Sequence, residues 1–162
     1  MISKIAITST LAFLGFAAIS QATTYSYKHP VVMMAYEEQA CSADGHEWNA
    51  EDGYCLIEDA ADFVWIVRKE DASYSVTIET ITTNAHTCSY EANNGKYVTP
   101  NKLVSSQPSS IFKDDKEVPA VCEVTVTHNA DNSVTVTTND REACQYFCGM
   151  NAELEIPKAT EK

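Results

Sequence analysis

Six cysteines, all downstream of an N-terminal segment with the features of a secretory signal, constrain this chain most. Lys4 supplies the positive start, a mostly apolar or small stretch runs from Ile5 to Ile19, and Ser20-Gln21-Ala22 offers small residues to signal peptidase. We predict residues 1–22 as a signal peptide that is cut after Ala22. Because disulfides persist in oxidising compartments, we expect the cysteines to be paired, in a periplasm or outside the cell.

A transmembrane anchor is the alternative interpretation of this segment. The uncharged stretch from Ile5 to Tyr27 loses its apolar character well before the roughly 20 residues that a spanning helix needs. A lipid anchor is disfavoured because the first cysteine, Cys41, lies far beyond the predicted cut. We therefore expect no membrane span after signal removal.

The mature chain is short and acidic. Its 140 residues suit one domain, within which we distinguish an acidic N-terminal segment over residues 23–60 and an antiparallel β domain over residues 61–162. It holds 10 Lys and Arg against 23 Asp and Glu, a net charge of -13, which argues against nucleic acid as a partner. Nine of these acids lie between Thr23 and Ile66, where Lys28 is the only base. Such a surface either keeps an exported protein soluble or attracts a cation, whether a basic protein, a cationic peptide or Ca²⁺.

One disulfide can be predicted from the local sequence. Between Cys41 and Cys55 the chain carries an Asp-Gly pair at each end and Trp48 midway, which is typical of a short hairpin closed on itself. A bond closing this loop contributes on the order of 3 kcal/mol. The pattern Cys-x₃-Gly-x₂-Trp-x₆-Cys resembles the small cysteine loops of chitin-binding peritrophin modules. That resemblance, over 15 residues, implies glycan binding by Trp48 and Tyr54.

Strand signals dominate the rest of the chain. The apolar run Phe63–Val67 and the alternating residues Tyr74, Val76 and Ile78 predict a hairpin joined by a polar turn, although a helix over 57–68 is a minority alternative. A further strand over 86–91 is expected to enter a turn at Asn93-Asn94-Gly95. Three prolines predict that residues 99–119 form a long mobile loop with at most a short strand near Leu103.

The clearest strand pair comes next. Residues 121–128 and 133–138 alternate on either side of a turn over 129–132, after which Asn139 or Asp140 can cap a short helix that ends before Gly149. Ala152, Leu154 and Ile156 alternate as a closing strand. The chain is therefore predicted to be all-β or mainly β: a small, disulfide-stapled antiparallel barrel or sandwich with one short C-terminal helix.

The remaining four cysteines leave two pairings open. Cys144 and Cys148 lie one helical turn apart, so a bond between them would strain a helix and each is expected to reach a different strand. We favour Cys88 with Cys148 and Cys122 with Cys144, and the crossed arrangement stays open.

The sequence from Cys88 onward resembles a group of exported bacterial domains. The shared pattern is Cys-x₃-aromatic-Cys-Gly-x-x-Ala, present here as Cys144-Gln-Tyr-Phe-Cys148-Gly149-Met-Asn-Ala152. The resemblance implies a common architecture and carries no activity. In size, compartment and β content such domains resemble the periplasmic inhibitors of lysozyme. The Ser-Gly-x-x-Tyr binding signature of the C-type inhibitors is not found in this chain, so no contact residue is carried over.

Candidate catalytic and metal-binding motifs are weak. The chain has no Gly-x-Ser-x-Gly turn, the Cys144 and Cys148 spacing is not that of a redox Cys-x-x-Cys, and the four histidines lack a zinc-binding spacing. A Ca²⁺ site at Asp44, Glu47, Glu51 and Asp52 is disfavoured because their spacing does not fit an EF-hand. We expect a protein that is not an enzyme and that holds no cofactor or metal.

The sequence leads to two hypotheses of function. The first is an exported acidic module that binds a cationic protein such as lysozyme and blocks its cleft with the acidic loop from Asp44 to Asp52 or with the segment 99–119. The second is a glycan-binding or structural module of the cell envelope. Six residues are the candidate binding residues of these hypotheses: Asp44, Glu47, Trp48, Glu51, Asp52 and Tyr54.

Overall fold

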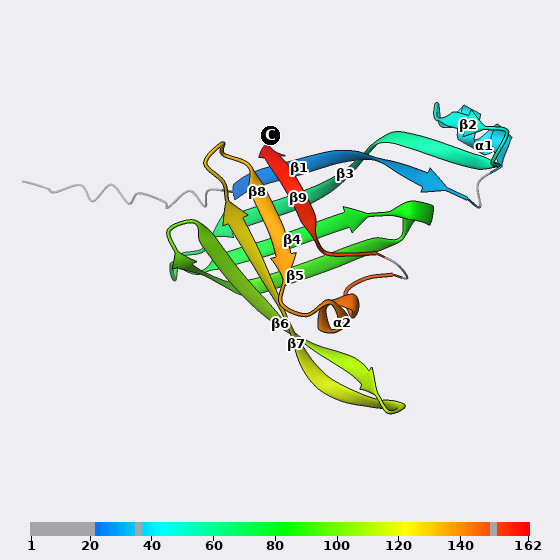
Figure 1. Cartoon of the computed structure of the whole chain (residues 1–162). Helices are drawn as coiled ribbons and strands as arrows, with labels where there is room; N and C mark the ends of the chain where they lie inside the picture. The colour runs from blue at the N-terminus through cyan, green and yellow to red at the C-terminus, as the bar shows by residue number, and fades with distance from the viewer. Residues whose placement is uncertain (1–21, 35–36, 150–151) are drawn as a thin grey trace, which may run out of the picture.

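A computed structural model describes residues 22–34, 37–149 and 152–162 and shows a mainly β protein (Figure 1). Eight antiparallel strands close into a barrel in the order β1-β9-β8-β7-β6-β5-β4-β3, and β3 pairs back with β1. The strands are β1 (Ala22–Met33), β2 (Glu47–Asn49), β3 (Tyr54–Arg68), β4 (Tyr74–Ile81), β5 (Thr87–Thr99), β6 (Lys102–Lys113), β7 (Lys116–His128), β8 (Val134–Thr138) and β9 (Ile156–Glu161). Two short helices, α1 (Glu38–Ala43) and α2 (Arg141–Gln145), and a 3₁₀ turn over Thr83–Ala85 complete the described part.

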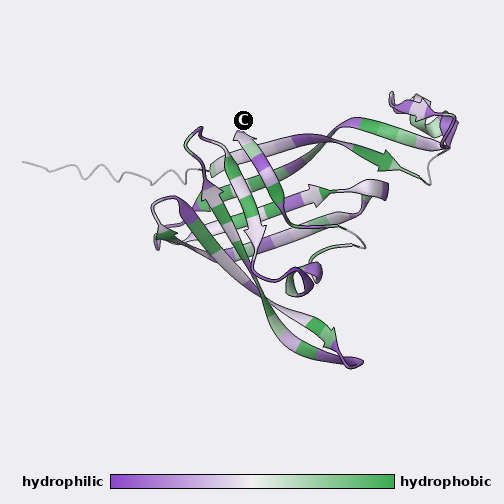
Figure 2. Ribbon diagram, viewed as in Figure 1, coloured by the Kyte–Doolittle hydropathy of each residue, from purple (hydrophilic) through white to green (hydrophobic). Residues whose placement is uncertain are grey.

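Alternation along the strands decides which side chains fill the barrel. Val64 and Ile66 on β3, Val76 and Ile78 on β4 and Val124 on β7 are buried, while their neighbours in the sequence are more exposed. Figure 2 shows this as bands of hydrophobic and hydrophilic residues along the ribbons. The register pairs Val64 with Ile78, which confirms the hairpin predicted for these segments. The barrel interior is thus a packed core, as expected for eight strands.

A tyrosine lies at the centre of that core. Tyr90 on β5 is fully buried, and its hydroxyl lies 3.1 Å from the hydroxyl of Ser105 on the neighbouring strand β6. Burial raises the pKa of Tyr90 to about 12, so its hydroxyl stays protonated. Because a buried tyrosine hydroxyl needs a partner, the Ser105 contact allows a large aromatic ring to fill the interior.

Two hairpins use the same turn construction. In the β3–β4 turn the Asp71 carboxylate accepts from the amide of Ser73 at 3.0 Å, and in the β7–β8 turn Asp131 accepts from the amide of Ser133 at 3.1 Å. Asp71 also accepts from the Ser73 hydroxyl, and Asp131 accepts from the Lys158 ammonium and the Ser133 hydroxyl. These side-chain bonds, together with the two amide bonds, hold the pKa of both carboxyls below its usual range. The turn predicted over 129–132 is thereby confirmed, and it is fixed by side chain to backbone bonds.

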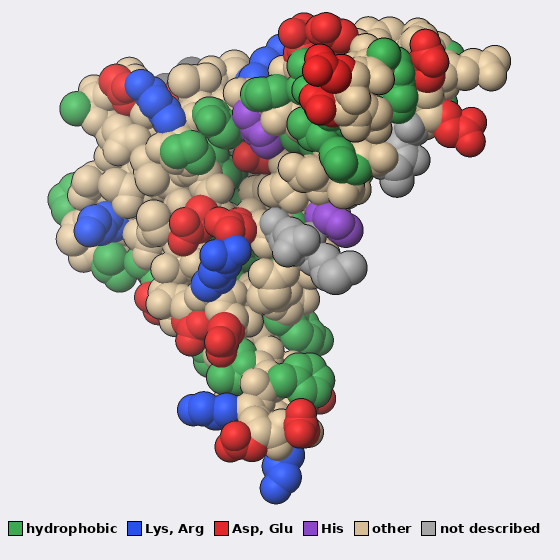
Figure 3. All heavy atoms as spheres, turned by 45° about the vertical axis from the view of Figure 1, so that its right-hand side comes forward, with side chains coloured by type: hydrophobic (Ala, Val, Ile, Leu, Met, Phe, Trp, Pro, Cys, Tyr) green, Lys and Arg blue, Asp and Glu red, His purple; other side chains and the backbone are tan. Residues whose placement is uncertain are grey.

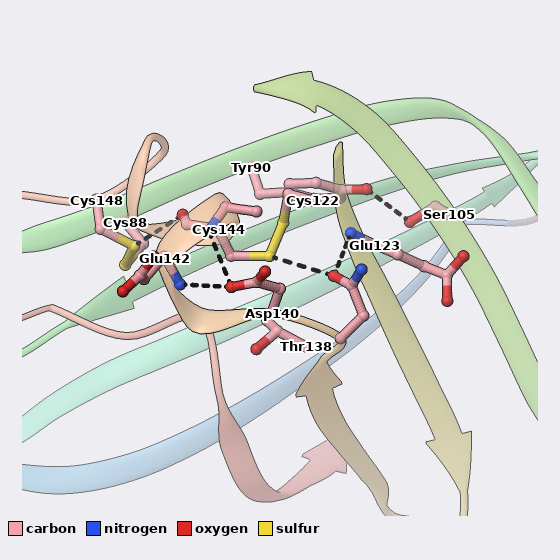
Figure 4. Close-up of a disulfide and its surroundings, with 12 residues drawn as sticks. Cys88, Tyr90, Ser105, Cys122, Glu123, Thr138, Asp140, Glu142, Cys144 and Cys148 are labelled. Carbon is pink, nitrogen blue, oxygen red and sulfur yellow. Dashed lines mark hydrogen bonds between the residues drawn. A yellow bond between two sulfur atoms is a disulfide. The ribbon is translucent and has the colours of Figure 1, made fainter. Parts of the chain in front are cut away.

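Two disulfides attach α2 to the barrel (Figure 4). Cys88 on β5 bonds Cys148, and Cys122 on β7 bonds Cys144 on α2, which is the favoured pairing rather than the crossed one. Asp140 caps the helix by accepting from the amides of Glu142 at 2.9 Å and Ala143 at 3.3 Å, as the sequence predicts.

The pairing of β5 with β6 is short. The register of β5 with β6 extends only from Lys96 to Thr99 on β5. Beyond that point the amide of Asn94 bridges the strands, donating to the Ser106 carbonyl at 2.9 Å and accepting from its N–H at 3.1 Å. The opening lies between β5 and β6. The two disulfides connect β5, through Cys148 and α2, to β7 on the other side of β6.

The predicted mobile loop over residues 99–119 is wrong. These residues include all of β6 and the first part of β7, and the two strands pair from Lys102 with Thr127 out to Lys113 with Lys116. The outer half of this hairpin extends away from the barrel, at the bottom of Figure 1. Pro108 and Pro119 lie in that extension, where the strands have no further neighbour and proline is tolerated.

The predicted turn at Asn93-Asn94-Gly95 is also wrong, because β5 runs through it. Gly95 is paired with Tyr74, and a Cβ added at Gly95 would lie 2.9 Å from the Tyr74 carbonyl oxygen. The glycine is needed for close approach of two strands at a register shift rather than for a turn.

Two smaller expectations need correction, and one lies outside the described residues. The structure has a second helix, α1, which begins before Cys41 and ends inside the Cys41–Cys55 loop, where the sequence predicts only a hairpin. Ala152 and Leu154 are buried, but the closing strand begins at Ile156. The predicted signal lies outside the described residues except for Ala22, which begins β1. No helix in the described ranges is long and apolar enough to cross a membrane.

Candidate functional site

The six candidate binding residues lie together on an extension of the barrel, at the upper right of Figure 1. We call residues 37–59 the acidic arm; it comprises α1, β2 and the first part of β3. Its fold depends on the predicted Cys41–Cys55 disulfide, whose two cysteines are fully buried. This bond places α1 beside the β2–β3 hairpin, and β1 pairs with the same part of β3 from Val31 to Met33.

Local hydrogen bonds shape the tip of the acidic arm. The side-chain oxygen of Asn49 accepts from the amides of Glu51 at 2.9 Å and Asp52 at 3.0 Å. Gly53 follows with a φ of +70°, a conformation that favours glycine, and Gly45 has a φ of +80° just after α1. The two Asp-Gly pairs of the sequence are therefore both turns, and they hold Glu51 and Asp52 outward.

The charged side chains of the acidic arm are negative and lie on its surface. Its eight carboxylates are all exposed, and it contains no Lys or Arg. They belong to Glu37, Glu38, Asp44, Glu47, Glu51, Asp52, Glu58 and Asp59. Figure 3 shows acidic side chains gathered over this extension. Asp62, which the sequence counts with the same acidic stretch, is instead buried in the barrel.

The two aromatic candidates of the acidic arm do not form a common surface. In the β2–β3 pairing Trp48 lies opposite Cys55, whereas Tyr54 lies opposite Asn49. Successive positions of a strand point to opposite faces, so the Trp48 and Tyr54 rings lie on different faces of the hairpin. Both are half-buried. A flat sugar-stacking platform would need the two rings on one face.

A groove that sequence reasoning missed lies between the outer β6–β7 hairpin and α2. Its volume is about 530 Å³, and its lining includes Phe112 and Glu117 on the hairpin and Glu142 and Tyr146 at the helix. Phe112 is 78% exposed and Tyr146 is 62% exposed, which is unusual for large rings. Because 34 positions separate the two rings and the hairpin was predicted as a loop, no sequence pattern relates them.

One open end of the barrel carries an aromatic cluster. A hollow of about 180 Å³ there is lined by Tyr25, Tyr74, Tyr97, His128 and the exposed Arg68, among others. The Tyr97 hydroxyl lies 2.8 Å from Nε2 of His128, and the Tyr74 and Tyr97 rings meet edge to face. Burial raises the pKa of Tyr97 and lowers that of His128, so both side chains are neutral at pH 7.

This histidine gives a prediction for stability against pH. Because the folded pKa of His128 lies below its unfolded value of about 6.5, the unfolded chain takes up the proton first as pH falls, and the folded state loses stability below pH 6.5. We expect His128→Gln to reduce this loss between pH 7.5 and 5.5. Urea unfolding across that range, with an NMR titration of the His128 ring, measures it. A ring that titrates at or above pH 6.5 would contradict the prediction.

The described residues do not gather a metal site: no group of three or more His, Cys, Asp or Glu side chains within them is placed to hold an ion. The exposed carboxylates of the acidic arm are spread over α1, β2 and two turns. Their arrangement suits a diffuse electrostatic attraction better than coordination of one cation.

Fold and disulfides define the class of this protein as a small eight-stranded antiparallel β-barrel with three disulfides and no free cysteine among the described residues. Three disulfides suggest an oxidising environment outside the cytoplasm. Comparison with protein-family models, with curated proteins and with solved structures gives no match at any of the three levels.

Proposed function

We propose that the protein is an exported binding module that docks a cationic protein through the acidic arm, in the periplasm or outside the cell. The observation that carries this proposal is the exposure of eight carboxylates, without a base, on a projection that a buried disulfide holds in shape. Lysozyme is the partner to test first, because it is cationic and acts in the same compartments, and because of the likeness of exported β domains to lysozyme inhibitors.

The expected mechanism is attraction followed by occlusion. Clustered carboxylates create a field that attracts a basic surface and speeds encounter, an effect of about 10- to 1,000-fold on association rates. A preformed arm loses little conformational freedom on binding, which favours affinity. The β2–β3 turn with Glu51 and Asp52 is narrow and projects from the barrel, so it has the form required to enter an enzyme cleft.

The test compares two triple variants that lower the negative charge equally. Glu47→Gln with Glu51→Gln and Asp52→Asn changes the acidic arm, while Glu70→Gln with Glu79→Gln and Glu91→Gln changes exposed acids elsewhere. Inhibition of c-type, g-type and i-type lysozymes is measured, and association rates are measured at low and moderate salt. We expect the arm variant to associate about tenfold more slowly at low salt and to depend less on salt, and the control to stay near the wild type.

Two outcomes would contradict the proposal. Equal effects of the two triple variants would show that net charge, rather than the acidic arm, governs association. No binding to any of the three lysozyme types would exclude lysozyme as the partner, and retention on insoluble chitin that survives high salt would then favour the glycan alternative.

A further inference from the structure

The groove between the outer β6–β7 hairpin and α2 is a second candidate contact surface, separate from the acidic arm. Phe112 and Glu117 are paired in the hairpin register, so their side chains share one face. Tyr146 and Glu142 border the groove from the side of α2. Each wall therefore presents one exposed aromatic ring and one carboxylate.

The wall of this groove on the side of α2 is preformed. The Tyr146 ring packs edge to face on Phe147 at 5.2 Å, and Phe147 packs in the same way on the buried Tyr90 at 5.3 Å. Cys144, within the helix, is bonded to Cys122 on β7, the strand that forms the hairpin with β6. A rigid aromatic wall keeps its position when a partner binds, so less ordering free energy is lost on binding.

Charge at the groove is negative on balance. Arg141 is the only base in the lining, and its guanidinium forms an ion pair with the carboxylate of Glu153. The carboxylates of Glu117 and Glu142 form no ion pair or side-chain hydrogen bond with any residue that the structure describes. The groove thus combines apolar rings with two available negative charges.

These features select the occupant. We infer that the groove binds a short peptide segment of a partner protein in which an aliphatic or aromatic side chain lies next to Lys or Arg. The apolar side chain lies between the Phe112 and Tyr146 rings, and the cation faces Glu117 or Glu142, with additional attraction to the ring faces.

Two other modes of contact fit the structure less well. Addition of a strand to the hairpin needs continuous backbone donors along its edges, and Pro108 and Pro119 each lack one. Pairing of two copies of this chain through the groove would bring together chains that each carry a formal charge of -12.

The probe for this proposal is the peptide acetyl-Lys-Leu-Trp-Lys-amide, and its matched control is acetyl-Glu-Leu-Trp-Glu-amide. Binding is followed by ¹⁵N NMR of the oxidised mature protein. We expect the basic peptide to shift amide signals of residues 110–117 and 141–146 and to bind at least tenfold more tightly than the acidic peptide. Glu117→Gln with Glu142→Gln should remove most of that difference.

Substitution of the rings tests the apolar half. Phe112→Ser and Tyr146→Ser should each lower the affinity for the basic peptide about tenfold. Both rings are highly exposed, so we expect each variant to keep the fold, and near-UV circular dichroism checks this. Shifts confined to the acidic arm would overturn the inference without affecting the proposed function, because that function is tested by the arm variants. A concentration-dependent dimer that Phe112→Ser dissociates would also overturn it, in favour of a second copy.

Discussion

Replacement of both Cys88 and Cys148 with alanine is expected to lower the free energy of unfolding of the barrel by about 4 kcal/mol. The bond closes 60 residues of chain, and its removal returns the corresponding entropy to the unfolded state. Removal of the bond also destabilises the native state directly. This bond links β5 to Cys148 just after α2, and the Cys122–Cys144 bond links β7 to α2 itself. A total loss of this size is a large fraction of the stability of a small domain.

The matched control is removal of the Cys41–Cys55 bond. It closes only 14 residues and lies in the acidic arm, so its loss, about 3 kcal/mol in the same model, is expected to loosen the arm rather than the barrel. The fluorescence of the two tryptophans distinguishes loosening of the arm from unfolding of the barrel, because Trp48 lies in the arm and Trp65 lies on the barrel part of β3. In a Trp48→Phe background, urea unfolding followed by Trp65 fluorescence should report a lower midpoint for the barrel variant and little change for the arm variant. Equal midpoints for both would contradict this division.

The sequence predicts the strands whose alternation is clean. The Tyr74 strand and the pair around residues 129–132 place apolar side chains on one face because that face fills the barrel. The run Phe63–Val67 is recognised instead by its continuous apolar character, and Val64 and Ile66 are its buried members. Cysteine spacing likewise predicts that Cys144 and Cys148 reach different strands. These features follow from the spacing of residues that are close together in the sequence, so they can be predicted from the sequence alone.

The elements that the sequence does not reveal lack such a pattern. The outer β6–β7 hairpin has water on much of its surface, so polar residues and Pro108 interrupt any apolar alternation, and proline at an unpaired edge is indistinguishable from a turn signal. Gly95 resembles a turn glycine, whereas its role is set by the approach of Tyr74 from another strand.

The candidate sites divide in the same way. The acidic arm is local, since its carboxylates all lie between residues 37 and 59 and the Cys41–Cys55 bond and two Asp-Gly turns fold this segment, and the sequence therefore predicts it. The groove is made by Phe112 and Tyr146, which only the folded barrel brings near one another. Asp62 is a third case: its charge places it among the surface acids, but its position in the alternation with Ala60, Val64 and Ile66 turns it inward.

Asp62→Ala is expected to destabilise the protein by about 3 kcal/mol. Asp62 is 5% exposed, and its carboxylate accepts from the backbone N–H of Ile81 at 2.9 Å and lies 3.1 Å from Nε2 of His29. The His29 contact has the distance of an ion pair without the alignment of a hydrogen bond. Loss of the carboxylate leaves the part-buried Ile81 N–H without an acceptor, which costs about 1–3 kcal/mol, and removes the negative charge beside Nε2 of His29.

Matched variants separate the parts of this effect. Asp62→Asn keeps an oxygen that can accept from the Ile81 N–H, so its loss of stability should be about half that of Asp62→Ala. Asp59→Ala, at an exposed position of the same strand, should change stability by less than about 0.5 kcal/mol. A double-mutant cycle with His29→Gln, measured by urea unfolding at pH 7, gives the coupling between the two side chains. A loss for Asp62→Ala no greater than that for Asp59→Ala would show that Asp62 is not a structural member of the core. The Asp62 carboxylate stabilises the interior of the barrel, whereas the eight carboxylates of the acidic arm charge its surface. Burial therefore decides which of the two roles a carboxylate has in this protein.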